Sequence, residues 1–208
     1  MIRISSMTVS VLVACIALPI ALAAPAAAQP ATTSCLGQVA SELSCPDGTK
    51  LRANDSAKAC YRKNEGKTGW AWLRHGPSVW HHLKDAKPIA AIRRAGNYVD
   101  HKKHGRHFYF TKQGKLERIV DYQNDDYGGY VIECHDNGQV KSMTTYKGKK
   151  IEGLVRRWNR DGSFKYASQY KNGKYVGRIK DGSAAGAAPA GLCQPKTCDL
   201  NAKVGTLP

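Results

Sequence analysis

Acidic side chains are scarce in this sequence, and so are long apolar runs beyond residue 30. Lys and Arg number 32 against 16 Asp and Glu, which gives a formal net charge of +16 at pH 7. This excess favours an anionic partner and is unusual for a cytosolic enzyme. The lack of a bilayer-length apolar run after residue 30 excludes an integral membrane protein for that part of the chain. The composition, with 42% hydrophobic and 23% charged residues, excludes a disordered chain.

Recognisable catalytic motifs are also missing. The chain has no Gly-x-Ser-x-Gly, no His-Glu-x-x-His and no phosphate loop, and it has no Cys-x-x-Cys pair of the kind that binds zinc. His101, His104 and His107 recur at three-residue spacing, but residues three apart on a strand point to opposite faces. His135 beside Asp136 suggests a general base, yet it falls at a turn of the repeat described below. We therefore expect a non-enzymatic protein with no catalytic residue, metal or cofactor.

The first 28 residues have the three parts of a secretory signal peptide. Arg3 supplies a positive charge, Val11–Ala23 an apolar segment, and Ala26–Ala28 a small-residue cleavage site. We expect a protein that is exported to the periplasm or secreted. Two alternatives are a buried N-terminal helix and a lipid anchor at Cys15. The anchor is less favoured because the apolar segment continues after that cysteine.

Six further cysteines follow the signal peptide, and export favours their pairing. Six cysteines allow 15 connectivities. The sequence favours two locally closed pairs, Cys45–Cys60 and Cys193–Cys198. Cys134 occupies a position where the flanking repeats carry Phe and Trp, so it is interpreted as a buried apolar thiol.

From residue 105 the sequence repeats every 24 residues, which indicates a repeat architecture. Two glycine columns and one tyrosine column share this interval: Gly105, Gly129, Gly153 and Gly177; Gly114, Gly138 and Gly162; Tyr122, Tyr146 and Tyr170. Apolar side chains alternate after each first glycine, as in a strand, and the Asn-Gly and Asp-Gly pairs of the second column are typical of hairpin turns. Each unit is therefore predicted to be a β-hairpin, with Leu116, Val120 and Tyr122 on one face. The tyrosine column is predicted to form a ladder that serves core packing rather than ligand binding.

The segments YKNGKYVG (Tyr170–Gly177) and WNRDG (Trp158–Gly162), with the Gly and Tyr spacing, resemble the MORN-repeat-variant family, also labelled YwqK-like antitoxins. The resemblance covers roughly residues 45–180. It implies an elongated, single-layer antiparallel sheet of tandem hairpins that acts as an interaction scaffold, in some members on acidic phospholipids. The predicted organisation is a signal peptide (1–28), a linker (29–44), divergent Cys-containing repeats (45–104), three regular repeats (105–180), and a flexible Ala/Gly linker with a Cys-containing tail (181–208).

Basic residues are concentrated in the repeats, since residues 101–180 hold 18 Lys and Arg against 8 Asp and Glu. The candidate contacts to an anionic partner are six residues near one hairpin: Lys147, Lys149, Lys150, Arg156, Arg157 and Arg160. Protection of sheet edges is the alternative role of such charges.

The sequence thus predicts an exported binding scaffold for a protein partner or an anionic envelope component, either a lipid headgroup or an acidic glycan. Nucleic acid is a possible partner through charge alone. Two other functions stay open. One is an exported enzyme or toxin acting on an acidic polymer through a histidine site, and the other is an immunity or antitoxin protein.

Overall fold

The structure, a computed structural model, describes residues 43–66, 69–179 and 192–193. The signal peptide predicted over 1–28 lies outside these residues. So do most of the linker predicted over 29–44 and of the tail predicted over 181–208, together with Cys15, Cys35 and Cys198.

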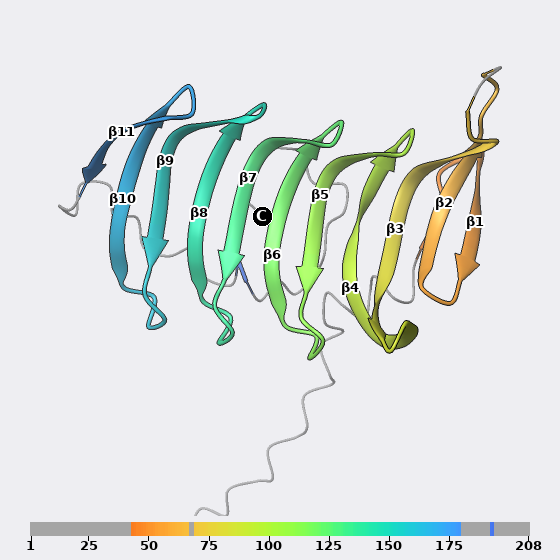
Figure 1. The fold of residues 1–208 in the computed structure, drawn as a ribbon, viewed down its shortest axis with the longest axis horizontal. Coiled ribbons are helices and arrows are strands. Elements are labelled where there is room, and N and C mark those ends of the chain that lie inside the picture. The colour runs from red at the N-terminus through yellow and green to blue at the C-terminus, as the bar shows by residue number, and fades with distance from the viewer. Residues whose placement is uncertain (1–42, 67–68, 180–191, 194–208) are drawn as a thin grey trace, which may run out of the picture. The chain divides into compact units, whose positions relative to one another are not determined.

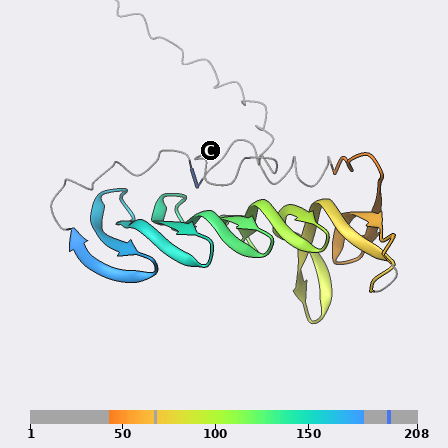
Figure 2. The ribbon, with the colours of Figure 1, turned by 90° about the horizontal axis from the view of Figure 1, so that it is seen from above.

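The prediction of an all-β chain built from hairpins is confirmed. Eleven strands form one open antiparallel sheet in which each strand pairs with its neighbours in the chain (Figure 1). Seen from above, this sheet is a single layer (Figure 2). The strands are β1 (Thr49–Asn54), β2 (Ala57–Lys63), β3 (Trp72–Lys84), β4 (Lys87–Val99), β5 (Lys102–Phe110), β6 (Leu116–Gln123), β7 (Asp126–Cys134), β8 (Val140–Lys147), β9 (Lys150–Trp158), β10 (Phe164–Lys171) and β11 (Lys174–Ile179).

No helix among the described residues has the length and apolar character that crossing a bilayer requires.

The second glycine column forms the turns of the regular hairpins. Gly114, Gly138 and Gly162 have φ angles of 78°, 81° and 83°, a region that glycine adopts without steric penalty. The same hydrogen bond closes each turn; for example, the Gly162 N–H donates to the Asn159 carbonyl at 3.0 Å. In the first column, Gly105 and Gly153 also have positive φ, whereas Gly177 lies within β11 without it.

Replacing Gly162 with Ala is expected to lower the free energy of unfolding by about 1–2 kcal/mol, the penalty of a side chain in the left-handed region. The added Cβ would meet Gln139 Oε1 at 3.5 Å, so space does not limit the substitution. Gly177→Ala is the matched control, because its Cβ would have no neighbour within 4 Å and its φ is not positive. Urea unfolding should separate the two variants, and equal stability would contradict a backbone role for the second column.

The hydrophobic core lies on one face of the sheet. Its buried members include Phe108, Phe110, Ile119 and Ile132 from the central strands. Residues from both flanks of the sheet pack on this face, since Leu43 contacts the core and Leu192 and Cys193 are buried in it. Terminal residues thus cover apolar side chains that a single sheet layer would leave exposed.

Two disulfides form among the described residues, and one differs from the prediction. Cys45–Cys60 is confirmed. Cys193 pairs with Cys134, 59 residues away, and not with Cys198. Cys134 is therefore a disulfide partner and not the free apolar thiol expected from its repeat position. The alternation of β7 directs Cys134 to the core face, where Cys193 is buried, and sequence spacing carries no signal of that proximity.

The prediction that Leu116 shares a face with Val120 and Tyr122 is wrong. The β5–β6 register shifts between Tyr109 and Phe110, so that Phe110 is paired with Leu116 while Tyr109 is paired with Arg118. One extra residue in a strand moves the side chains beyond it to the other face. Leu116 therefore joins the core, and Tyr122 lies on the opposite face.

The predicted tyrosine ladder forms in part, as two separate groups of rings that include tyrosines outside the column. Tyr127 stands between Tyr122 and Tyr146, with ring centroids 5.6 and 4.7 Å away. Column members lie on every second strand, about 10 Å apart, so a ring from the intervening strand has to bridge them. Tyr170 packs against Tyr175, at 5.7 Å. These rings lie on the face opposite the hydrophobic core, so the prediction that the column serves core packing is wrong.

Candidate functional site

The face opposite the core carries a continuous line of arginine and aromatic side chains. Successive Cα partners from β3 to β10 define it, and we call it the arginine row: Trp80, Arg94, Tyr109, Arg118, Glu133, Ser142, Arg157 and Tyr166. Arg178 of β11 extends the row, because its guanidinium carbon lies 3.8 Å from the centroid of the Tyr166 ring.

The row arises from the 24-residue repeat. Arg94 and Arg118 are separated by 24 residues, and Tyr109, Glu133 and Arg157 form a second column at the same interval. Each column places a side chain at an equivalent point of every second strand. These columns are present in the sequence, but they are not among the Gly and Tyr columns from which the hairpins are predicted.

Stacking on aromatic rings holds most of these cations in place. Arg94 lies 5.2 Å from the Trp80 centroid, and Arg118 lies 4.8 Å from the Tyr109 centroid. A guanidinium over an aromatic face gains about 0.5–2 kcal/mol, and its in-plane N–H groups stay available to an anion. The row therefore presents oriented donors rather than freely rotating charges.

The ion pairs that arginines form among the described residues lie away from this face. Away from the face, Arg62 pairs with Asp100, Arg106 with Asp121, and Arg160 with Asp136. On the face, six arginines form no salt bridge with any described residue: Arg52, Arg74, Arg94, Arg118, Arg157 and Arg178. Glu133 is the Cα partner of Arg118, but its carboxylate accepts a hydrogen bond from Ser142 at 2.9 Å. The face thus has uncompensated positive charge.

A buried histidine supports the middle of this face. The His107 ring is fully buried between Tyr98 and Tyr122, with centroids at 5.4 and 5.0 Å, and its Nε2 donates to the Asn97 carbonyl at 2.8 Å. Gly96 faces it, and a Cβ there would come within 2.3 Å of the ring. Desolvation lowers the His107 pKa to about 3, so the ring is neutral at pH 7. His107 is therefore a packing residue and adds no charge to the face.

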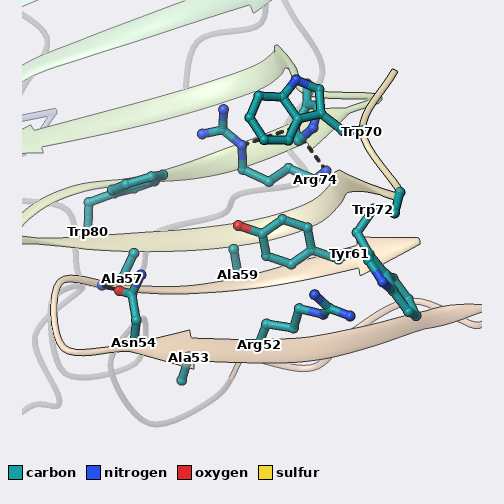
Figure 3. A pocket seen from close by; sticks show the side chains of 12 residues that line it. Arg52, Ala53, Asn54, Ala57, Ala59, Tyr61, Trp70, Trp72, Arg74 and Trp80 are labelled. Atoms are coloured by element: carbon teal, nitrogen blue, oxygen red, sulfur yellow. Dashed lines mark hydrogen bonds between the residues drawn. The ribbon is translucent and has the colours of Figure 1, made fainter. Parts of the chain in front are cut away.

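A pocket of about 730 Å³ opens at the β1–β3 end of the same face (Figure 3). Small side chains line part of it, among them the buried Ala57 and Ala59. Four aromatic side chains and two arginines surround them: Tyr61, Trp70, Trp72, Trp80, Arg52 and Arg74. Its volume lies within the range of small-molecule sites.

The six predicted basic contacts do not form one patch. Lys147, Lys149 and Lys150 lie at the β8–β9 turn, where Lys149 Nζ is 3.5 Å from an Asp126 carboxylate oxygen. Arg160 lies beyond the other end of β9 and pairs with Asp136. Consecutive residues of a strand point to opposite faces, and Arg156, whose Cα partner is the core residue Met143, is on the core face. Of the six, Arg157 belongs to the arginine row.

The four histidines of the alternative enzyme hypothesis each have a separate environment. His101 Nδ1 accepts hydrogen bonds from the backbone and side chain of Arg74, and His104 is paired with Asn97 across β4 and β5. His107 is buried, as described above. His135 lies beyond β7, with Nε2 3.2 Å from the Trp158 carbonyl. No group of three or more His, Cys, Asp or Glu side chains suited to a metal occurs in the described part of the chain.

Comparison with protein-family models and with curated proteins finds no match to this sequence.

Proposed function

We propose that the protein is a non-enzymatic binding scaffold whose arginine row recognises an anionic component of the cell envelope. The observation that carries this proposal is the set of face arginines that stack on aromatic rings and have no carboxylate partner among the described residues. An arginine held in place but left without an anion is prepared for an external carboxylate, sulfate or phosphate.

Export is part of the proposal. The signal-peptide pattern, the two disulfides and the charge of +16 are together consistent with a protein that works in an oxidising compartment beside an anionic surface. Membership of the MORN-repeat-variant family is proposed on the same footing, from the 24-residue hairpin repeat and the single-layer sheet. An antitoxin role would require a cognate toxin.

The row can be tested by removing three of its charges. The row variant carries Arg94→Gln, Arg118→Gln and Arg157→Gln. The control variant carries Lys112→Gln, Lys141→Gln and Lys165→Gln, three exposed lysines outside the row, and so loses the same net charge. Both variants should retain the circular dichroism of the parent chain.

Binding is measured to immobilised polygalacturonate and to vesicles containing phosphatidylglycerol, at several salt concentrations. We expect the row variant to lose about a thousandfold or more in affinity for whichever probe binds, because each of the three charge-assisted hydrogen bonds contributes about 1.5–3 kcal/mol. The control variant should stay within about threefold of the parent, since it alters only the long-range charge. Equal losses in the two variants would show that net charge alone drives binding and would contradict a role for the row.

A further inference from the structure

The pocket at the β1–β3 end offers hydrogen-bond donors and no acidic side chain. Its lining holds no Asp or Glu side chain. Arg52 and Arg74 supply guanidinium groups, and Asn54 supplies an amide. Asn54 Oδ1 already accepts from the backbone N–H groups of Ser56 and Ala57, at 3.0 and 2.8 Å, so its NH₂ group can face a ligand. The pocket is therefore suited to a ligand rich in acceptor oxygens and carrying negative charge.

Both guanidinium groups are positioned before any ligand arrives. Arg52 stacks 4.0 Å from the Trp72 ring centroid. Arg74 donates from Nε to His101 Nδ1 at 3.2 Å and lies 4.7 Å from the Tyr98 centroid (Figure 3). Burial and the Arg74 charge lower the pKa of His101, which keeps this ring neutral at pH 7. The Nη groups of Arg74 are left for an anion, and preorganisation of this kind reduces the entropy lost on binding.

Trp70 adds a ring surface to these donors. Its side chain is 76% exposed, and its contact with His101 is edge-on, with centroids 6.4 Å apart. Figure 3 shows the Trp70 ring at the mouth of the pocket beside Arg74. An exposed indole beside hydrogen-bond donors can pack against the C–H face of a sugar ring while the donors bind its oxygens.

The spacing of the row favours a glycan over a nucleic acid. Arg94, Arg118, Arg157 and Arg178 lie on β4, β6, β9 and β11, so successive arginines are two or three strands apart, about 10–14 Å. A stacked nucleic-acid strand carries one phosphate every 3.4 Å or so, several for each arginine. A glycan with one acidic group in each sugar or disaccharide unit carries fewer charges along its length, closer to the spacing of the row.

We infer that this pocket binds one carboxylate-bearing sugar unit of an acidic glycan, with Arg52 and Arg74 donating to its acceptor oxygens and Trp70 covering the ring. This inference rests on the proposed function, since the same polymer would continue along the arginine row. It adds a specific subsite to a face that would otherwise bind through spaced charges alone.

Short oligosaccharides test the pocket separately from the row, because they are too short to follow the sheet. Calorimetric titration would use three acidic probes: tetragalacturonate, a hyaluronan tetrasaccharide and the peptidoglycan disaccharide with its muramic acid carboxylate. Fully methyl-esterified tetragalacturonate is the neutral control ligand. We expect at least one acidic probe to bind and the neutral ligand to bind at least tenfold more weakly.

Three variants locate the binding. Arg52→Gln and Trp70→Ala should each weaken binding of the oligosaccharide at least tenfold. Lys58→Gln, which removes one exposed charge from neighbouring β2 outside the pocket lining, should leave it unchanged. Arg52→Lys keeps the charge without the planar donor group, so its affinity for the oligosaccharide should lie between those of the parent and of Arg52→Gln.

The outcomes separate this inference from the proposed function. Binding of polygalacturonate or of vesicles through the row, with none of the three oligosaccharides bound, would overturn the sugar pocket and leave the scaffold function standing. Tighter binding of a single-stranded oligonucleotide than of every glycan at the same salt would also overturn the pocket. Failure of all probes, polymers and vesicles included, would overturn both proposals.

Discussion

The double variant Cys134→Ser, Cys193→Ser is expected to unfold with a free energy about 4 kcal/mol lower than that of the parent chain. The disulfide closes a loop of 59 residues, and the chain-entropy relation assigns about 4 kcal/mol to a loop of that length. It also holds Leu192 and Cys193 in the core, both at most 5% exposed. Their release would expose apolar side chains of the core face to water.

Chemical unfolding in urea, followed by tryptophan fluorescence, measures this difference. The variant Cys45→Ser, Cys60→Ser is the comparison, because its loop of 15 residues predicts about 3 kcal/mol from the same relation. The Cys134–Cys193 variant should also bind a dye specific for apolar surfaces, whereas the Cys45–Cys60 variant should bind less of it. A loss below about 1 kcal/mol without dye binding would contradict the role of Cys193 in covering the core.

Stability is expected to fall as the pH is lowered from 7 to 4.5, and His107 is the main reason. Its pKa is about 3 in the folded chain, chiefly through burial, against 6.5 when unfolded. Arg94 and Lys103 lower this pKa further, while the Asn97 carbonyl and Asp125 act in the opposite direction. Between these two pKa values the unfolded chain binds a proton that the folded chain does not, so acid favours unfolding.

The expected loss between pH 7 and 4.5 is about 3 kcal/mol, since one pKa unit corresponds to 1.36 kcal/mol or so. Carboxylates with a lowered pKa contribute little to the change in stability between pH 7 and 4.5. The Arg62 hydrogen bond is the main cause that lowers the Asp100 pKa to about 2, and its stabilising effect is lost only as the pH falls below the usual Asp value of 3.8. His101, whose pKa is also lowered by burial, acts in the same direction as His107.

His107→Phe isolates the contribution of one ring. Phenylalanine keeps a ring against Gly96 but loses the hydrogen bond to Asn97, which should lower stability at pH 7 by about 1 kcal/mol. Between pH 7 and 4.5 the free energy of unfolding of this variant should fall by only a small part of the roughly 3 kcal/mol expected for the parent. Urea unfolding at pH 7 and 4.5 gives both values, and an unchanged pH dependence would contradict a buried neutral His107.

Much of the fold was predictable because the determining signals are local. Asn137-Gly138 and Asp161-Gly162 predict hairpin turns since glycine accepts the positive φ that each turn requires. Alternation in GYVIECH predicts β7, with Ile132 and Cys134 on one face. The resemblance to MORN-repeat variants implies that successive hairpins join one sheet, and the structure has that arrangement.

The site was less predictable because the face on which a side chain lies depends on the register of its strand. Arg156 and Arg157 look equivalent in sequence, yet one lies on the core face and the other in the arginine row. Some strand pairs shift register by one residue, as β6 does opposite Tyr109 and Phe110, and such a shift exchanges the faces beyond it. A cluster of charges along the chain is therefore no guide to a cluster on the surface.

The sequence by itself determined the strands and turns of the regular repeats, which follow from local conformational preference and repetition, and it favoured the Cys45–Cys60 pair, which closes a short loop. Only the tertiary structure decided which face each arginine occupies, which rings stack on them, and that Cys134 meets Cys193. Those features depend on distances between residues far apart in the chain. Such distances are set by strand register and by the packing of terminal residues on the core face, neither of which is written in the spacing of the residues involved.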